Sequence, residues 1–318
     1  MKRFSYLRPI KTKGIFYNSK NTGGMRAKAK ATNTLVYALL GLISVIWILP
    51  FIYLVLQSFA KSYSPTKLIP TEWTFNNYRA LFDKSFVMNF NGNEMVFANV
   101  YPFGRWMLNT FIIALCVSIF QTVLTLMSAY AFSRLSFNFR KKYMKLILVI
   151  GMFPGFLGMI ITFYILKQVN LTNGFNAIFG LILVNISGAV MGYYVSKGFF
   201  DTISKSLDEA AMIDGANKNT IFWRVIMPLS KPIIVYTVLL GFTGPWGDYM
   251  FASVMAGGDS KLFNVAVGLK QLMSKESGTS GFPIFCAAGV IVSIPIMTLF
   301  FFLQRYYVEG VTGGAVKG

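Results

Sequence analysis

The sequence predicts an all-α protein that crosses a membrane several times. Of its 318 residues 55% are hydrophobic and only 13% are charged, whereas a soluble domain carries about 25% charged residues. The chain also contains repeated apolar runs of ~20 residues, each long enough to cross the hydrocarbon core of a bilayer as a helix. Helices are expected because a backbone in lipid must satisfy its own hydrogen bonds. A soluble protein with a large core would have no use for several such runs.

The first 33 residues form a basic tail, which we expect to be disordered. The tail holds nine lysines and arginines and no acidic residue. Such a tail before an apolar span holds the N-terminus in the cytoplasm, and it can lie on the anionic headgroups of membrane lipid. Binding of RNA is the alternative, but topology already accounts for the charge, so we expect no nucleic acid as a partner. The apolar run 35–56 is too long for a cleavable signal peptide.

Residues 34–318 are predicted to form one membrane domain with six spans. With the N-terminus inside, the cytoplasmic segments hold 21 of the 30 basic residues, an asymmetry that favours cytoplasmic N- and C-termini and an even number of spans. The predicted spans lie near 34–57, 106–131, 145–166, 175–197, 232–254 and 283–304.

The first outer loop, 58–105, is long and rich in aromatic residues and proline. A loop of this length with its own apolar content is expected to be ordered. Two interpretations remain open: interfacial helices that rest among the headgroups, or a contact surface for an extracellular partner.

Metal and redox chemistry are not indicated by the residues present. The chain contains no histidine, and its two cysteines, Cys116 and Cys286, lie in apolar runs. We interpret both as small hydrophobic residues, and we predict neither a disulfide framework nor a metal site.

A polar segment of about 35 residues, 198–231, separates the fourth and fifth spans. Ser206 and Glu209 have the S-x-x-E spacing of a capping box, and Gly215 is placed to end the helix in a left-handed conformation. The spacing therefore predicts a short helix over 206–214. One face of this helix would carry residues that allow another surface to approach closely, namely Leu207, Ala210, Ala211 and Asp214.

A second helix is predicted directly after the first. Asn217 or Asn219 can cap it, and Pro228 ends or kinks it before the fifth span. A mere connector between two spans is the alternative, although connectors are usually shorter. The segment is therefore predicted to dock a partner outside the membrane.

The docking segment resembles the EAA loop of ABC importer permeases, whose pattern is EAA, three residues, G, nine residues and I-x-L-P. The chain departs from this pattern only by Val225 for Ile and Met227 for Leu. Further segments, across residues 34–318, resemble the MalG-type permeases of carbohydrate importers: Asn109, Ala129-Tyr130-Ala131-Phe132-Ser133-Arg134, Met152-Phe153-Pro154, Pro70 with Asn77-Tyr78, and Gly314-Ala315-Val316-Lys317-Gly318.

This resemblance implies the fold of a type I ABC importer permease in the cytoplasmic membrane of a bacterium. It implies a second permease subunit, two ATPase subunits that carry ATP and Mg, and an extracellular sugar-binding protein. The chain itself has no G-x4-G-K-[ST] motif and is expected to be neither an enzyme nor the holder of a cofactor. The residues predicted to contact the ATPase are Ser206, Leu207, Asp208, Glu209, Ala210, Ala211, Asp214 and Gly215.

The fifth span is the candidate substrate path. Its Gly244-Pro245 pair loosens a helix near mid-membrane, and Asp248 is the only acidic residue in any predicted span. Ionisable residues in a membrane usually face a cavity or a partner. Here Asp248 could accept hydroxyl hydrogen bonds while Trp246, Tyr249 and Phe251 offer flat faces to sugar rings. An interfacial Asp248 within an aromatic belt is the alternative. Weaker candidates are Asn109, Asn185, Tyr193 and Tyr194.

The leading prediction is a permease subunit that imports an oligosaccharide substrate, first of all malto-oligosaccharides. A path without basic residues suits a neutral glycan, and an anionic uronate oligosaccharide is the alternative. A secondary transporter would need acid pairs or an inverted repeat in its spans. A membrane glycosyltransferase would need paired carboxylates, whereas Asp208 and Glu209 point about 100° apart on a helix.

Overall fold

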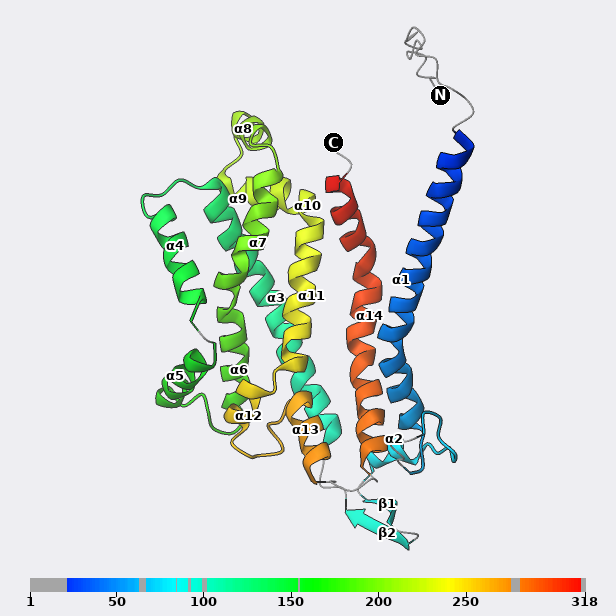
Figure 1. The fold of residues 1–318 in the computed structure, drawn as a ribbon. Coiled ribbons are helices and arrows are strands. Elements are labelled where there is room, and N and C mark those ends of the chain that lie inside the picture. The colour runs from blue at the N-terminus through cyan, green and yellow to red at the C-terminus, as the bar shows by residue number, and fades with distance from the viewer. Residues whose placement is uncertain are drawn as a thin grey trace. The chain divides into compact units, whose positions relative to one another are not determined.

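The computed structural model describes residues 22–62, 67–83, 85–90, 93–98, 102–153, 155–275 and 281–315. These residues are mostly helical, as predicted (Figure 1). The chain divides into two compact units, Met1–Tyr53 and Leu54–Gly318, which are described separately. Most of the predicted basic tail, as well as Pro154 and the last three residues, lies outside the described part.

The first unit consists of the long helix α1 (Thr22–Ser58), whose last turn enters the second unit. The segment Thr32–Ser58 is long and apolar enough to cross a membrane. The helix begins at Thr22, so the end of the predicted disordered tail is helical instead. Alanine and lysine alternate over 27–31, and both residues favour helix.

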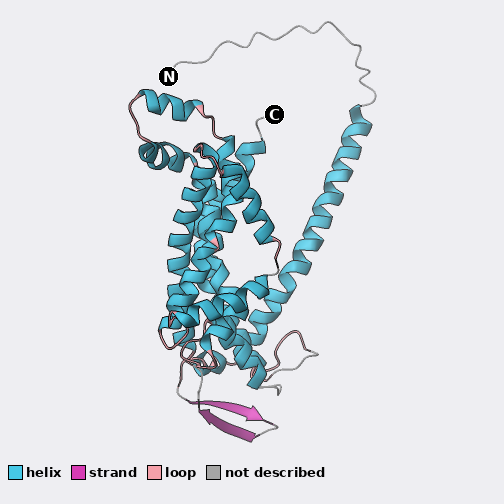
Figure 2. Cartoon of the chain, turned by 90° about the vertical axis from the view of Figure 1, so that its left-hand side faces the viewer, coloured by secondary structure: helices cyan, strands magenta, loops and turns pink. Residues whose placement is uncertain are grey.

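The second unit is organised around the helix α3 (Phe103–Arg134), which packs against helices that lie far apart in the sequence. Figure 2 shows the chain turned by 90°, with its helices in cyan and its two strands in magenta. Its neighbours are α6 (Asn176–Ser187), α7 (Ala189–Thr202), α11 (Lys231–Gly247) and α13 (Val265–Lys275). The helix α14 (Phe282–Ala315) packs against α11. The remaining helices are α2 (Asn76–Ala80), α4 (Arg140–Gly151), α5 (Gly155–Gln168), α8 (Ser206–Ile213), α9 (Lys218–Thr220), the π-helical η2 (Ile221–Ile226), α10 (Met227–Leu229) and α12 (Met250–Ala256).

Three helices are long and apolar enough to be single spans, and counting two bent helix pairs as spans gives up to five within the described residues. The single spans match the first, second and sixth predicted ones: Thr32–Ser58, Phe103–Arg134 and Phe282–Tyr306. The count of six therefore stays a prediction.

Three of the predicted spans are not continuous helices. The span near 145–166 is divided into α4 and α5, where the sequence has Pro154 and Gly155; a proline disfavours helical geometry at the residue before it. The span near 175–197 is divided at Gly188, and the span near 232–254 is divided at Asp248, three residues after Pro245. Proline and glycine inside these runs explain the breaks, which apolar length alone does not reveal.

The outer loop contains a β-hairpin, which the sequence analysis did not predict, although the described chain is mostly helical. Strands β1 (Ser85–Phe90) and β2 (Asn93–Ala98) pair antiparallel. The dipeptide between them in the sequence is Asn91-Gly92, which is typical of a two-residue hairpin turn. The loop is ordered over its described parts, as expected: the Asn77 side chain donates to the carbonyls of Ser58 and Ala60, at 2.9 and 2.8 Å.

Two hydrophobic clusters fill the second unit, one toward each end of α3. The cluster around Trp106 joins α3 to α6, α11, α12, α13 and α14. The other, around Tyr193 and Ile226, joins the C-terminal half of α3 to α7, η2 and α11. Cys116 and Cys286 are free, and Cys286 is buried in the manner of a small hydrophobic residue.

Candidate functional site

The predicted docking helix forms as α8, an exposed helix at one end of the second unit (Figure 1). Its C-terminal end has the predicted left-handed glycine: Gly215 has a φ of 80°. The Ala216 amide donates to the Ala211 carbonyl at 2.9 Å, and the Gly215 amide donates to the Met212 carbonyl at 3.0 Å. This pair of bonds is the Schellman motif, which stops a helix and satisfies its last carbonyls.

The predicted capping box at the start of α8 was wrong. The residue at the N-cap is Lys205, which makes no side-chain capping bond. Ser206 lies inside the first turn, and its hydroxyl is 2.7 Å from the Ser204 hydroxyl. The Ser206 amide donates to that Ser204 hydroxyl at 3.3 Å. The hydroxyl that accepts a hydrogen bond from the start of α8 therefore belongs to Ser204, two residues before the Ser206 that the motif suggests.

The outer surface of α8 combines small, apolar and acidic side chains. Glu209, Ala210 and Asp214 are exposed, and Ile213 is 87% exposed. Leu207 and Met212 are exposed apolar residues beside them. Ala211 is half-buried and packs against the hydrophobic cluster around Ile226, so the predicted face is exposed except at this residue.

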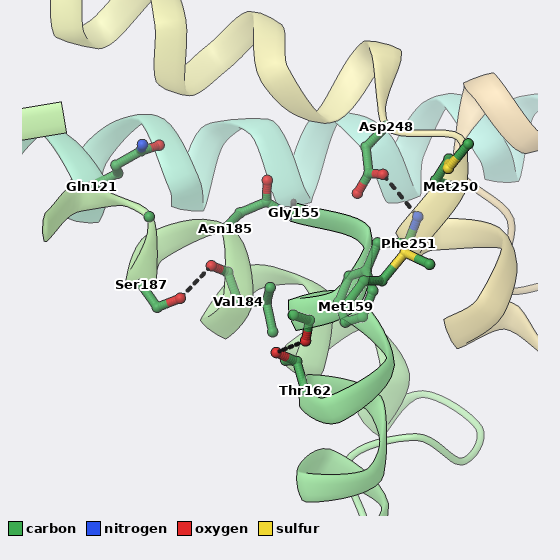
Figure 3. A pocket seen from close by; sticks show the side chains of 12 residues that line it. Gln121, Gly155, Met159, Thr162, Val184, Asn185, Ser187, Asp248, Met250 and Phe251 are labelled. Carbon is green, nitrogen blue, oxygen red and sulfur yellow. Dashed lines mark hydrogen bonds between the residues drawn. The ribbon is translucent and has the colours of Figure 1, made fainter. Parts of the chain in front are cut away.

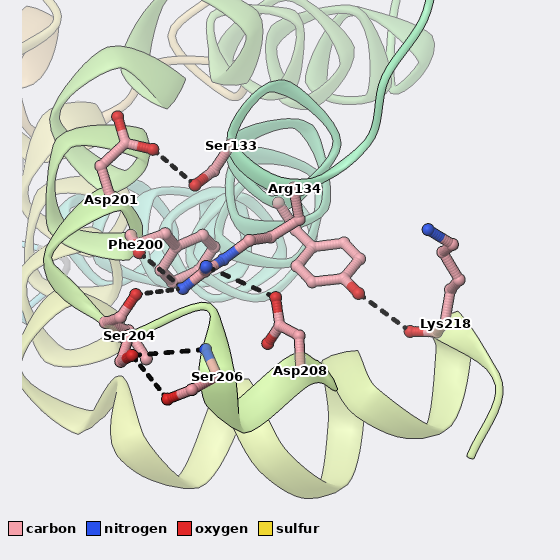
Figure 4. A network of polar contacts seen from close by, with 10 residues as sticks. Ser133, Arg134, Phe200, Asp201, Ser204, Ser206, Asp208 and Lys218 are labelled. Carbon is pink, nitrogen blue, oxygen red and sulfur yellow. Dashed lines mark hydrogen bonds and ion pairs between the residues drawn. The ribbon is translucent and has the colours of Figure 1, made fainter. Parts of the chain in front are cut away.

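Asp208 lies in a different place from the predicted contact surface. Its side chain is buried, and one carboxylate oxygen is 3.4 Å from the Arg134 guanidinium at the end of α3. The guanidinium also donates to the carbonyls of Phe200 and Ile203, at 2.9 and 2.7 Å (Figure 4). A buried carboxylate needs such a partner because desolvation penalises an isolated charge. Asp208 therefore faces the interior, and Arg134 is a residue whose role in this site the sequence did not reveal.

The second predicted helix of the loop is also present. The Asn217 side chain accepts a hydrogen bond from the Thr220 amide at 2.8 Å and caps α9. The helical run Lys218–Leu229, which contains Pro228, meets α11 at a bend of 86°. Proline thus redirects the chain before α11, as predicted.

A cavity of about 750 Å³ lies where three of the broken helices meet (Figure 3). Gly155 begins α5, Ser187 and Gly188 mark the break between α6 and α7, and Asp248 marks the break between α11 and α12. The remaining lining residues are Gln121, Gly158, Met159, Thr162, Val184, Asn185, Met250 and Phe251. None of the lining residues is basic.

Two of the candidate polar residues from the sequence meet in this cavity, together with one aromatic residue. Asp248 and Asn185 both line it, as does Phe251. The Asp248 carboxylate accepts a hydrogen bond from the Phe251 amide at 3.1 Å, which fixes its orientation at the start of α12. Asn264 donates to the Asp248 carbonyl at 2.6 Å and thereby satisfies the broken end of α11.

Gln121 and Thr162 are lining residues that the sequence prediction missed. Both lie within predicted spans, where a polar side chain often faces a cavity. Their position in apolar spans is the sequence signal that could have indicated them.

The other candidates for the substrate path lie elsewhere. Trp246 is buried in the core beside Phe242, with ring centroids 5.8 Å apart. Asn109 donates to the carbonyls of Lys261 and Phe263 and so holds a loop in place. Tyr193 is fully buried in the cluster around Ile226. Tyr194 and Tyr249 are partly exposed, and neither lines the cavity.

No group of three or more potential metal ligands occurs among the described residues.

Comparisons with known proteins place this architecture in a family. A family model described as the binding-protein-dependent transport system inner membrane component matches residues 121–313. The maltodextrin transport system permease protein MalD of Streptococcus pneumoniae is 32% identical, covering 92% of this chain and 99% of MalD. The galactooligosaccharides transport system permease protein GanQ of Bacillus subtilis is 33% identical, covering 89% of this chain and 94% of GanQ.

A solved structure of a bacterial ABC transporter involved in the import of the acidic polysaccharide alginate has the same fold. Its matching chain gives a TM-score of 0.66 at 22% identity, covering 92% of this chain and all of that one. At this identity the likeness concerns the fold alone. The family match and the identity over most of the chain show that this protein belongs to the binding-protein-dependent transport system inner membrane components, among the MalG-type permeases of sugar ABC importers.

Proposed function

We propose that this chain is one permease subunit of an ATP-driven importer of neutral oligosaccharides, malto-oligosaccharides first of all. The observation that carries the proposal is the convergence of three helix breaks on one cavity that is lined by both polar and apolar side chains. Irregular backbone at membrane depth is tolerated where it lines a cavity or is buried in protein. Breaks of this kind are also how transporters expose backbone groups to a substrate.

The chemistry of the cavity suits an uncharged sugar. The Asp248 carboxylate can accept hydroxyl hydrogen bonds, and the amides of Asn185 and Gln121 can both donate and accept them. Met159 and Phe251 offer apolar surface to the C–H faces of a sugar ring. A uronate oligosaccharide would place carboxylates beside Asp248 without a basic partner among the lining residues.

The relatives support an oligosaccharide but do not separate one neutral glycan from another. The permeases named for maltodextrin and for galactooligosaccharides are equally similar to this chain. The cavity chemistry favours both of these over an anionic glycan. We choose malto-oligosaccharides because several of the relatives carry that name.

The exposed helix α8 is proposed as the docking element for a partner ATPase, which holds ATP and Mg. Ala210 lets a partner surface approach the helix backbone closely, and Ile213 and Leu207 supply apolar contact area. Glu209 and Asp214 supply charge at its rim. Rigid-body movement of the ATPase subunits would then be transmitted through this loop to the spans.

The assembly proposed around this chain contains a second permease, two ATPase subunits and an extracellular binding protein. One fold relative, the bacterial alginate ABC transporter, was solved in complex with an alginate pentasaccharide-bound periplasmic protein. We further propose six spans with both termini in the cytoplasm, the third span being the interrupted pair α4 and α5. In this arrangement 34–318 is the permease domain and 198–231 its coupling loop.

Uptake by the reconstituted complex tests the proposal. Proteoliposomes that hold ATP and the full complex should accumulate labelled maltotriose, and Asp248→Asn should lower uptake at least about tenfold. The matched control is Glu72→Gln, the same change at an exposed carboxylate that is bound to Lys61. Competition by unlabelled galactooligosaccharide and by alginate oligosaccharide identifies the preferred glycan. Inhibition by alginate alone would overturn the neutral-substrate assignment.

A further inference from the structure

The end of α3 is attached to the coupling loop on both sides of α8. Arg134, its last residue, donates to the carbonyls of Phe200 and Ile203, where α7 ends, and forms the ion pair with Asp208 in the first turn of α8. One turn earlier, the Tyr130 hydroxyl donates to the Lys218 carbonyl at 3.2 Å, where α9 begins. Figure 4 shows the Arg134 guanidinium between Phe200 and Asp208.

The charges of these helix ends explain why an arginine fits at this point. The last carbonyls of α7 lack helical partners and lie at the negative end of its dipole, which attracts a cation. Asp208 lies at the positive end of α8, which favours an anion. The planar guanidinium can donate in both directions at once, whereas a lysine ammonium is a point charge without this fork.

The ion pair is also the deepest attachment of α8. Asp208 is the only buried residue of this helix, all of which is described. The side chain of Arg134 is 4% exposed and that of Asp208 10% exposed. Apart from this contact, α8 touches mainly η2. A force applied to the exposed face of α8 can therefore reach α3 through Arg134, beside the apolar contact of α8 with η2.

The same helix reaches the cavity. Gln121 is on α3 and lines the cavity, and it is separated from Arg134 by ~20 Å of continuous helix. The bond from Ser133 to Asp201, at 2.6 Å, additionally fixes α7 to α3 beside the ion pair. Displacement of α8 would thus move the ends of α3 and α7 together.

We infer that Arg134 is a positioning residue that couples α8 to α3, so that movement imposed on α8 by the ATPase is delivered along α3 to the cavity. This inference rests on the proposed function. It assigns to Arg134 and Asp208 a role in the transmission of movement, not in contact with the ATPase or with the sugar.

The coupling ratio, meaning the ATP molecules hydrolysed per maltotriose molecule transported, tests this role in the reconstituted complex. Asp208→Asn and Arg134→Lys should raise the ratio about tenfold and about threefold respectively, because ATP is still hydrolysed while movement is lost. The amount of ATPase subunit that copurifies should not change. The double variant should show no larger ratio than Asp208→Asn, because both changes disrupt one contact.

Arg105→Lys is the matched control, since Arg105 is exposed near the opposite end of α3. Its ratio should equal that of the wild type.

A merely structural role for the ion pair predicts that hydrolysis and transport fall together with the amount of assembled complex, and this result would overturn the inference. An unchanged ratio in Asp208→Asn would overturn it as well. Absence of maltotriose uptake by the wild type would instead overturn the proposed substrate, and the ratio would then be measured with labelled galactooligosaccharide or labelled alginate oligosaccharide, whichever the wild type accumulates.

Discussion

The two ends of α3 are held by different kinds of interaction. At the Phe103 end, Trp106, Asn109 and Thr110 make neutral hydrogen bonds to a loop 150 or so residues away, with distances of 2.8 to 3.0 Å. At the Arg134 end the contact is an ion pair, with 3.4 Å between the Arg134 guanidinium and an Asp208 carboxylate oxygen. The other Asp208 oxygen and the Arg134 Nε have no hydrogen-bond partner among the described atoms.

The difference indicates which end is built to be rigid. Neutral bonds that are fully satisfied and closely packed have one arrangement, whereas the unsatisfied buried atoms of the charged pair raise the energy of this arrangement relative to one in which they find further partners. The Trp106 end should therefore determine stability, and the Arg134 end should determine the transmission of movement. The following variants test this division, from the largest expected loss of stability to the smallest.

Gly268→Ala should have the largest effect. A Cβ atom at Gly268 would lie 2.1 Å from the Trp106 ring, so the ring or the helix α13 must move. We expect a loss of about 3 kcal/mol, the upper range for overpacking, measured as a lowered thermal midpoint of the purified protein in detergent. Gly104→Ala is the control, because its nearest neighbour, Phe82, would lie 4.0 Å away. Equal midpoints for the two variants would contradict the packing argument.

Asn109→Ala should have the next largest effect. It leaves the carbonyls of Lys261 and Phe263 without their donor, at a cost of about 2 kcal/mol. The coupling ratio of the assembled complex should stay at the wild-type value. A raised coupling ratio with an unchanged thermal midpoint would instead assign the transmission of movement to the Trp106 end of α3.

Asp208→Asn should destabilise the protein by no more than about 2 kcal/mol, because asparagine retains an acceptor for the guanidinium although the buried charge of Arg134 loses its counter-charge. The coupling ratio should nevertheless rise as described above. The informative comparison is between this variant and Asn109→Ala, measured for both midpoint and ratio. If the thermal midpoint and the coupling ratio changed in parallel in both variants, the two ends of α3 would not differ in their roles.

Glu209→Lys should have the smallest effect on stability, within about 0.5 kcal/mol, since its side chain is exposed on α8. Transport should be lost, because the charge at the proposed contact with the ATPase is reversed. Membrane insertion and thermal midpoint are measured beside maltotriose uptake. Normal uptake would remove α8 from the docking surface.

Much of this arrangement could be predicted from local sequence. The left-handed Gly215, the cap at Asn217 and the bend at Pro228 depend on the backbone preferences of single residues. The three long spans follow from apolar length. The hairpin was also predictable, since Asn91-Gly92 lies between two short runs that contain valine and phenylalanine.

The candidate site also has a part that the sequence indicated and a part that it could not. The sequence indicated Asp248 and Asn185 because polar residues in apolar spans are rare and have a reason to be there. It could not distinguish them from Asn109, which is equally polar and equally within a span, because the difference lies in which carbonyls come near each side chain.

By itself the sequence therefore predicted a mostly helical membrane protein, the positions of its three long apolar helices and the short helix that we propose as the docking element, because these depend on composition, periodicity and local backbone geometry. Only the tertiary structure decided that Asp208 faces Arg134, that Tyr193 and Trp246 belong to the core, and that three helix breaks line one cavity. These outcomes depend on contacts between segments far apart in the chain, and local preferences carry no information about such contacts.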